Sequence, residues 1–324
     1  MTVEPVFDMM NQGPVICISC SDDGTKIATG DRNGKLTLAD QNGTKNWEKD
    51  IDEGIYGLAI LGNGNKVACG GKDCKLRMLN SLGNVEWEQT VGKSIWSMAM
   101  DPSGQFIAVG TGDSISMYTE GGLQLWEHTT NRAMVGISIS GNGSLIVGCG
   151  DEFLYCLNSD GNLLWEKQRS DSLWDVAVEK DGETVFVGGW DCKVQCLDKH
   201  GEEEWNFTTG GYVRSVVPLN DGGILAGSHD GNMYHLSRSG ELLEKFETGG
   251  EVTCVSASKQ MDLAVAGSGT GIRGFRMNPV AGPMAVEDSY EKQEIERTPI
   301  RNEEHGTAEG YEPMFGAGMF DEPI

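Results

Sequence analysis

Residues 94–129 read SIWSMAM, DPSG, QFIAVG, TGDS, ISMY, TEGG and LQLWEHT, an alternation of apolar runs and turn-forming clusters. Short apolar runs bounded by Gly, Asp, Asn and Ser are typical of β-strands joined by tight turns. The stretch therefore predicts four short strands in succession. The same order of strand and turn signals recurs along the chain before and after it, which makes it one unit of a repeat.

Two series of residues give the period of this repeat. Five tryptophans stand 39 or 40 residues apart, and each lies four residues after a glycine: Trp47, Trp87, Trp126, Trp165 and Trp205 after Gly43, Gly83, Gly122, Gly161 and Gly201. A second glycine series keeps the same phase: Gly30, Gly70, Gly110, Gly148, Gly188, Gly227 and Gly267. A period of about 40 residues is that of one four-stranded propeller blade. The large rings, repeated at one position, are expected to pack between blades.

The chain supplies seven inner strands but only six outer strands after them. The missing strand is expected at the N-terminus, because Phe7 precedes Pro14 by seven residues, as Trp47 precedes Gly54. Residues 3–10 would then complete the last blade and close the ring, which removes exposed strand edges. We therefore predict an all-β fold over residues 1–278, a seven-bladed β-propeller of four-stranded antiparallel blades.

Residues 279–324 differ in composition from the repeat. They contain 11 acidic and 3 basic residues, a net charge of -8, and few large apolar side chains. Such a segment is predicted to be a disordered acidic tail. Its apolar residues gather within 311–320: Tyr311, Met314, Phe315, Met319 and Phe320. This cluster predicts a docking peptide that orders on a partner, and the alternative is a tail that solubilises the protein or folds back on its own propeller.

Composition narrows the classes of function. The formal net charge is -24, which argues against nucleic-acid binding because a phosphate backbone requires a basic surface. Apolar runs stay far below the roughly 20 residues that span a bilayer, and the start lacks a secretory signal, so we expect a cytoplasmic protein with no membrane contact. The nine cysteines, an odd number scattered over strands, indicate free thiols. Cys17 and Cys20 form a CxxC, but in a strand they point to opposite faces, so no metal site is expected.

The repeat resembles the WD-repeat propellers and their quinoprotein-like relatives over residues 3–278. The likeness is carried by runs such as ISCSDDGTKIATGDRNGKLTLAD at 18–40 and SMAMDPSGQFIAVGTGDSISMY at 97–118. The Gly-His and Trp-Asp pairs of WD units are absent. The Gly-x-x-x-Trp of the fourth strand is instead similar to the Gly-x-x-Trp of quinoprotein-like blades. Our interpretation is that the propeller is a non-catalytic protein-interaction scaffold.

Residues that break the symmetry of the repeat are the candidate site. The resemblance to WD-repeat propellers implies that the residue at the entrance to each inner strand, the position two residues earlier and the turn residue before the second hairpin's Asp lie on the top face, where partners bind. The non-repeating residues at these positions are Trp174, Trp190, Tyr212, Arg214, His229, Trp96, Tyr56 and Lys72. Aromatic and Arg side chains are enriched in interface hot spots. We therefore expect a protein or peptide partner there, with basic segments because the chain is acidic, and a monomeric propeller.

Two alternatives remain open. In the first, Trp174, Trp190 and Tyr212 form an aromatic cage that reads a methylated or cationic side chain. In the second, the channel mouth holds the active site of a quinone-dependent dehydrogenase-like enzyme. Neither has a motif in its favour: the five histidines are dispersed, and the glycine-rich run at 267–271 lacks the lysine and the helix of a phosphate loop. No enzyme activity, cofactor or metal is expected.

Overall fold

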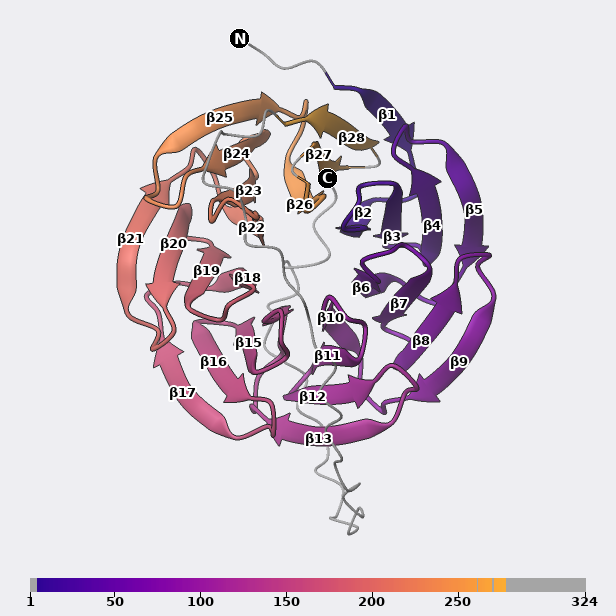
Figure 1. Ribbon diagram of the computed structural model, residues 1–324, viewed down its shortest axis with the longest axis horizontal. Helices are drawn as coiled ribbons and strands as arrows, with labels where there is room; N and C mark the ends of the chain where they lie inside the picture. The colour runs from indigo at the N-terminus through magenta and orange to yellow at the C-terminus, as the bar shows by residue number, and fades with distance from the viewer. Residues whose placement is uncertain (1–4, 261, 270, 278–324) are drawn as a thin grey trace.

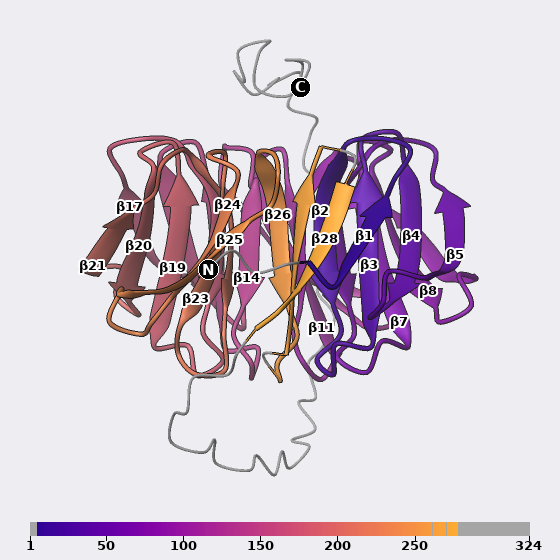
Figure 2. The same cartoon turned by 90° about the horizontal axis from the view of Figure 1, so that it is seen from above.

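The structure is a computed structural model that describes residues 5–260, 262–269 and 271–277. Every regular element within these ranges is a β-strand, and the strands form seven four-stranded antiparallel sheets. Figure 1 shows the sheets arranged as blades around a central axis, and Figure 2 shows the same ring from the side. The predicted seven-bladed β-propeller is thus confirmed. None of the described residues forms a helix long and apolar enough to cross a membrane.

Each blade supplies one strand to each of four layers, counted from the axis outwards. The innermost strands are β2 (Val15–Cys20), β6 (Ile55–Ile60), β10 (Ile95–Met100), β14 (Gly136–Ile139), β18 (Leu173–Val178), β22 (Val213–Pro218) and β26 (Val252–Ala257). The second strands are β3 (Lys26–Asp31), β7 (Lys66–Gly71), β11 (Phe106–Thr111), β15 (Leu145–Gly150), β19 (Thr184–Gly189), β23 (Ile224–Ser228) and β27 (Leu263–Ser268). The third strands are β4 (Lys35–Asp40), β8 (Lys75–Asn80), β12 (Ser114–Thr119), β16 (Phe153–Asn158), β20 (Lys193–Asp198), β24 (Asn232–Leu236) and β28 (Gly271–Arg276). The outer strands are β5 (Lys45–Asp50), β9 (Val85–Thr90), β13 (Gln124–Thr129), β17 (Leu163–Gln168), β21 (Glu203–Thr208), β25 (Leu242–Glu247) and β1 (Phe7–Met10).

The N-terminal strand belongs to the seventh blade. β1 pairs antiparallel with β28, with Phe7 opposite Gly274 and Met10 opposite Gly271. The sheet order is β1, β28, β27, β26, so the two ends of the propeller share one blade. The described part of the strand predicted at residues 3–10 therefore occupies the outer position that the sequence assigns to it. The predicted acidic tail with its docking peptide, residues 279–324, lies outside the described residues.

The repeated tryptophans lock each blade to the next. In all five cases the indole Nε1 donates a hydrogen bond to a backbone carbonyl in the turn between the third and fourth strands of the following blade. The pairs are Trp47 with Ser81 at 2.9 Å, Trp87 with Glu120 at 2.9 Å, Trp126 with Ser159 at 2.9 Å, Trp165 with Lys199 at 2.7 Å and Trp205 with Arg238 at 3.0 Å. The predicted packing of these rings between blades is confirmed.

The glycine series completes the same contact. The turn that receives each ring contains the glycine at a positive φ, as at Gly161 with φ 80°. A Cβ at Gly161 would lie 2.6 Å from the ring of Trp126, so only a glycine lets the indole lie against the backbone. The tryptophan of one repeat therefore packs on the glycine of the next repeat, which explains why the two series keep one phase.

Two blades lack the repeated tryptophan, and the contact between ring and turn explains both exceptions. Glu244 stands where the sixth blade would carry its tryptophan, and that ring would need a turn between the third and fourth strands of the seventh blade. No continuous turn joins these strands, because β28 and β1 lie at opposite ends of the described chain. Phe7 on β1 makes the equivalent contact from the seventh blade to the first, since its ring lies 2.7 Å from the Cβ position of Gly43. The residues that replace tryptophan in the sixth and seventh blades therefore reflect how the chain connects the blades.

We predict that Trp126 and Gly161 are energetically coupled. Trp126→Ala should lower the free energy of unfolding by about 3–5 kcal/mol through the lost ring contacts. Gly161→Ala should lower the free energy of unfolding by about 1–2 kcal/mol because alanine is strained in the left-handed conformation, and further because its Cβ clashes with the ring. Gly92→Ala is the matched control, because Gly92 has φ 78° and a Cβ there meets no atom within 4 Å. In the Trp126→Ala background, Gly161→Ala should cost only as much as Gly92→Ala, as measured by urea unfolding; strictly additive effects would contradict the contact.

We also predict that removal of residues 1–10 destabilises the ring. The deletion takes away β1 with its ladder to β28 and leaves the edge of β28 unpaired. Thermal unfolding should shift to lower temperature and become less cooperative, as followed by circular dichroism and calorimetry. Unchanged cooperative melting would show that β1 does not contribute to closure.

Candidate functional site

A bulge in the inner strands places one side chain of each blade at the channel mouth. In six blades the pairing of the inner strand skips its second residue; in β10, for example, Ile95 pairs with Thr111 and Ser97 with Gly110. A bulge leaves its extra residue unpaired and redirects its side chain. These second residues, with Val135 of the fourth blade, line the central channel of about 340 Å³: Ile16, Tyr56, Trp96, Val135, Trp174, Arg214 and Thr253. The structure thus brings together the equivalent positions that the sequence aligned.

Five of the predicted residues form one continuous group, the blade 5/6 cluster: Trp174, Trp190, Tyr212, Arg214 and His229. The rings of Trp174 and Trp190 are stacked with centroids 6.2 Å apart, and Trp190 stacks on Tyr212 at 4.9 Å. His229 lies 5.8 Å from Tyr212 at the outer end of this column. The guanidinium of Arg214 covers the ring of Trp174 at 3.5 Å. Tyr212 keeps 39% of its surface exposed and gives the cluster its solvent-facing side.

Backbone hydrogen bonds hold the three segments of the blade 5/6 cluster in register. Trp190 follows β19, and its N–H donates to the carbonyl of Ser172 at 2.9 Å. The N–H of His229 donates to the carbonyl of Tyr212 at 2.9 Å. The hydroxyl of Thr209 lies within donating distance of two backbone carbonyls, those of Cys192 at 2.9 Å and Gly211 at 2.6 Å. The aromatic column is therefore built on rigid strand ends and is preorganised before any ligand binds.

The remaining predicted residues form a second group, the blade 2/3 cluster: Tyr56, Lys72 and Trp96. Tyr56 meets Trp96 edge to face at 5.1 Å, and the ammonium of Lys72 lies 5.6 Å from the Tyr56 ring and 6.0 Å from the Trp96 ring. Among the contacts of the described residues, none joins this group to the blade 5/6 cluster. The sequence treats all eight residues as one sector, whereas the structure divides them into two clusters on different blades.

The blade 5/6 cluster carries buried positive charge. Burial lowers the pKa of Arg214 to about 10, and Arg32 adds to this effect as a neighbouring like charge, so Arg214 stays protonated at neutral pH. Burial lowers the pKa of His229 and Arg214 lowers it further, which favours the neutral imidazole. Three buried donor atoms, Nε of Arg32, Nε of Arg214 and Nε1 of Trp190, have no hydrogen-bond acceptor within the described part of the chain. This end of the channel therefore offers donors and positive charge in an apolar surrounding.

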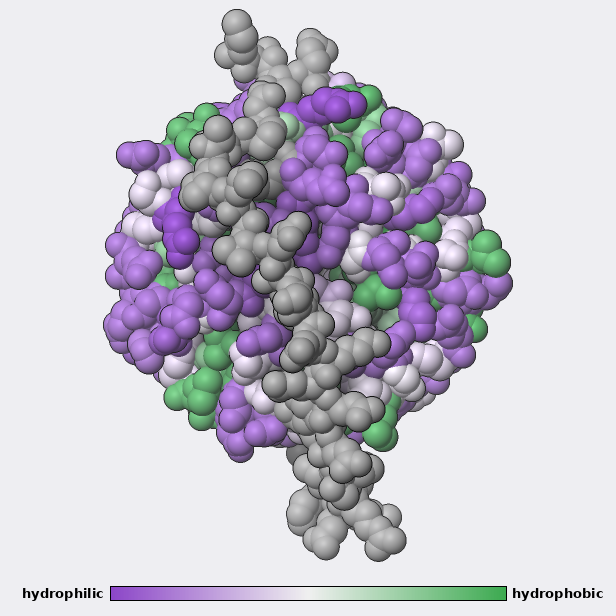
Figure 3. Space-filling model, viewed as in Figure 1, coloured by the Kyte–Doolittle hydropathy of each residue, from purple (hydrophilic) through white to green (hydrophobic). Residues whose placement is uncertain are grey.

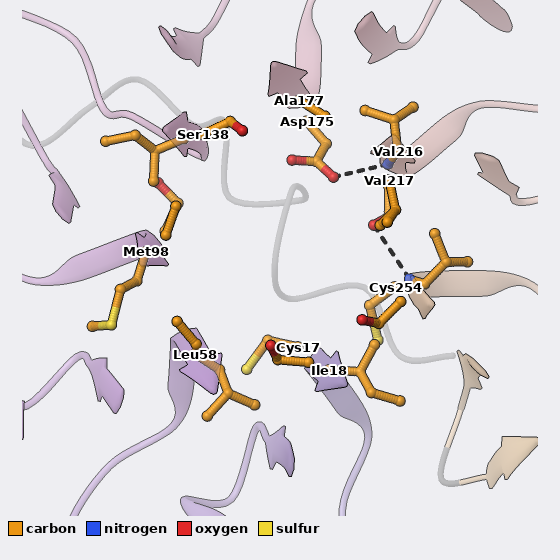
Figure 4. A pocket seen from close by; sticks show the side chains of 18 of the residues that line it. Cys17, Ile18, Leu58, Met98, Ser138, Asp175, Ala177, Val216, Val217 and Cys254 are labelled. Atoms are coloured by element: carbon orange, nitrogen blue, oxygen red, sulfur yellow. Dashed lines mark hydrogen bonds between the residues drawn. The ribbon is translucent and has the colours of Figure 1, made fainter. Parts of the chain in front are cut away.

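Asp175 on β18 is a charged residue of the channel wall that the sequence analysis did not single out. Figure 4 shows its carboxylate turned toward β22, where it accepts a hydrogen bond from the N–H of Val216 at 2.9 Å. Its other oxygen accepts from the N–H of Val176 at 2.9 Å. Burial raises the pKa of Asp175 to about 6 against the effect of these bonds. The signal was present in the repeat, since the other inner strands have at this position Cys17, Gly57, Ser97, Gly136, Ser215 and Cys254.

The geometry argues against an aromatic cage. A cage presents ring faces to an open space in which a cation can sit. Here the near-parallel rings of Trp174 and Trp190 face each other with an interplanar angle of 9°, and the guanidinium of Arg214 already lies on Trp174. The three rings of the proposed cage therefore form a column rather than the walls of a pocket.

The residues of the channel also do not fit a quinone held with calcium. Calcium takes six to eight oxygen ligands, usually with several carboxylates. The described channel wall has one carboxylate, Asp175, whose oxygens accept backbone N–H groups, and one guanidinium, Arg214. Elsewhere in the described residues, no group of three His, Cys, Asp or Glu side chains is arranged to hold a metal ion.

We predict that Asp175 makes stability depend on pH. Its pKa in the folded protein, about 6, exceeds its ordinary value of 3.8, so its stabilising contribution is complete below the ordinary value and is lost as pH rises through 6. Relative to Asp175→Asn, the wild-type free energy of unfolding should fall by about 2 kcal/mol between pH 4 and pH 7. Urea unfolding of both proteins at four pH values tests this. Parallel pH profiles would contradict a perturbed Asp175.

Comparison with known proteins places the chain within one of the two resembled groups. The sequence profile of the family described as outer membrane protein assembly factor BamB matches residues 91–243 and 151–279, more than half of the chain. A shorter stretch is 30% identical over 82 residues to lambda-carrageenase of Pseudoalteromonas carrageenovora, which covers 24% of this chain and 9% of that protein. Another is 38% identical over 76 residues to the beta-alanine-activating enzyme of Mus musculus, covering 21% and 7%. The chain thus spans less than a tenth of either relative. Because the profile and the seven antiparallel blades agree, this chain belongs to the PQQ-like β-propeller family described as outer membrane protein assembly factor BamB.

Proposed function

We propose that this protein is a non-catalytic interaction scaffold that binds a peptide or protein segment at the channel mouth through the blade 5/6 cluster. The observation that carries the proposal is the continuous column of Trp174, Trp190 and Tyr212, capped by Arg214 at one end. A symmetric ring needs no such column for its own assembly, because equivalent positions in other blades hold Ile16, Val135 and Thr253.

The chemistry of the cluster suits a binding hot spot. Tyr, Trp and Arg side chains supply most of the binding energy in protein interfaces, and rigid aromatic rings lose little conformational entropy on binding. The exposed ring of Tyr212 gives a partner its first contact. The blade 2/3 cluster, with exposed Lys72, would provide a second anchor at the same mouth.

The chain as a whole carries a net charge of -24, whereas the mouth carries positive groups. The two regions therefore suit different segments of a partner. Figure 3 shows hydrophilic residues spread over one face of the ring, with hydrophobic residues in separate small areas. An acidic surface speeds the approach of partners with basic segments. The groups at the mouth, Arg214 and Arg32, instead suit carbonyl or carboxylate oxygens. We therefore assign basic segments of a partner to the outer surface and an oxygen-rich segment to the mouth.

Three further observations support the remaining parts of the proposal. All nine cysteines are free thiols, which agrees with the reducing environment of the cytoplasm. The family description names an outer membrane protein assembly factor, which agrees with a scaffold. The apolar residues at 311–320 of the tail would make a second contact with the partner. The ring itself would act as a monomer, since β1 of the same chain completes the seventh blade.

Affinity purification with the full-length chain tests the proposal. The double variant Trp190→Ala/Tyr212→Ala should lose the main partner by at least tenfold, because one hot-spot residue contributes about 2 kcal/mol or more. Leu164→Ala is the control, since Leu164 is a large exposed side chain on the outer strand β17, away from the mouth. Partner recovery is quantified by mass spectrometry. Equal recovery by wild type, control and double variant would refute the proposal.

A further inference from the structure

The channel mouth combines a buried guanidinium with aromatic rings, which suits an acidic and aromatic ligand. Arg214 is buried against Trp174, and the only carboxylate in the described channel wall, Asp175, spends its oxygens on the N–H groups of Val176 and Val216. Besides burial, Arg32, a like charge, lowers the pKa of Arg214, whereas the carboxylates of Asp175 and Glu251 raise it. Buried positive charge of this kind is stabilised when a carboxylate of a ligand comes within hydrogen-bonding reach.

Several buried hydrogen-bond donors also lack an acceptor among the described residues. The Nε atoms of Arg32 and Arg214 and the Nε1 atom of Trp190 are buried without an acceptor among the described residues. A buried donor without an acceptor costs about 1–3 kcal/mol, and proteins leave few of them. Two of these donors, on Arg214 and Trp190, belong to the blade 5/6 cluster and lie beneath the surface that a bound segment would cover.

The chain itself contains a segment of that chemistry. Residues 309–324 read EGYEPMFGAGMFDEPI, in which four carboxylates alternate with five aromatic or methionine side chains and no basic residue occurs. Two further groups match the mouth: methionine and aromatic side chains make favourable contacts with indole rings. The negative charge of this segment is opposite in sign to the positive charge of Arg32 and Arg214.

The connection is long enough to reach the mouth. Arg276 pairs with Leu263 at the end of the seventh blade opposite to Val252, the mouth end of β26. The chain must therefore cover the thickness of the ring, roughly 20 Å for a six-residue strand. From Asn278 to Tyr311 the chain extends to roughly 110 Å at about 3.3 Å per residue. A tether of this length also gives the segment an effective concentration near the millimolar range, so a weak contact is saturated.

We propose that the C-terminal segment of the same chain, residues 311–324, docks on the blade 5/6 cluster and occupies the channel mouth. The carboxylates near the end of the chain pair with Arg214 and Arg32, and the aromatic and methionine side chains pack on the column of Trp190 and Tyr212. This inference rests on the proposed function, because it uses the same surface. A partner then has to displace the tail, which makes the tail an internal competitor that raises the threshold for binding.

Hydrogen exchange measured by mass spectrometry on the full-length protein tests the docking. Backbone amides of residues 311–320 should exchange at least tenfold more slowly than in a free peptide of residues 309–324. The protection should disappear in Arg214→Met and in Phe315→Ala/Phe320→Ala, and persist in Leu164→Ala. Exchange of the wild-type segment at the rate of the free peptide would overturn the inference. Protection that grows with protein concentration would overturn it as well, because the occupant would be a second copy.

The two proposals fail in different ways in this design. A freely exchanging tail together with loss of partner in Trp190→Ala/Tyr212→Ala refutes the self-docking and leaves the interaction scaffold in place. A protected tail that is released by Arg214→Met supports the self-docking even where the purification of partners shows no dependence on the mouth. A stability check by thermal unfolding separates release of the tail from unfolding of Arg214→Met, and Phe315→Ala/Phe320→Ala tests the same contact without touching the ring.

Discussion

The contact of each indole ring with the glycine of the next blade is the constraint on which the ring depends. A blade by itself is a small twisted sheet with two open faces, and it becomes stable only when its neighbours cover them. The buried clusters accordingly span pairs of blades, as Val187 and Leu173 of the fifth blade pack with Leu154 of the fourth. At the outer edge the tryptophan adds a hydrogen bond of 2.7–3.0 Å to the neighbour's turn, which fixes the angle between blades as well as their contact.

This contact also explains what the sequence repeats and what it leaves free. A ring with identical neighbours needs the same residues at the same place in each blade, so the tryptophans and glycines recur. The series breaks at Glu244 and continues at Phe7 because the seventh blade is assembled from both ends of the described chain. The bulged second residue of the inner strand carries no such constraint, since its side chain points into the mouth of the channel. Function is free to vary there, and the aromatic column has formed at that position.

The fold was predictable to the level of individual strands, and the site only in part. The repeat period, the turn residues and the spacing of tryptophan and glycine can all be read from the local sequence. They were sufficient to derive the number of blades and the origin of the last outer strand. The candidate residues were found because they break the repeat. Their assignment to blades 5 and 6 and to blades 2 and 3 followed from the repeat, but the ring contacts within each group could not be derived, because they depend on side-chain directions at neighbouring bulges. Asp175 was missed for a related reason: its effect comes from burial beside the N–H of Val216, forty-one residues away along the chain. Such burial is a property of the closed ring.

The sequence by itself determined the architecture of this protein, because a propeller is built from short-range strand and turn patterns that repeat with one period. It also determined which positions depart from that period. Only the tertiary structure decided the character of the mouth. Packing of the sixth blade against the fifth brings Arg214 onto Trp174 and stacks Trp190 between two other rings, and it buries donors that would be hydrated on an open surface. Charge, stacking and desolvation at that mouth are long-range consequences of packing seven blades around one axis, and no local pattern encodes them.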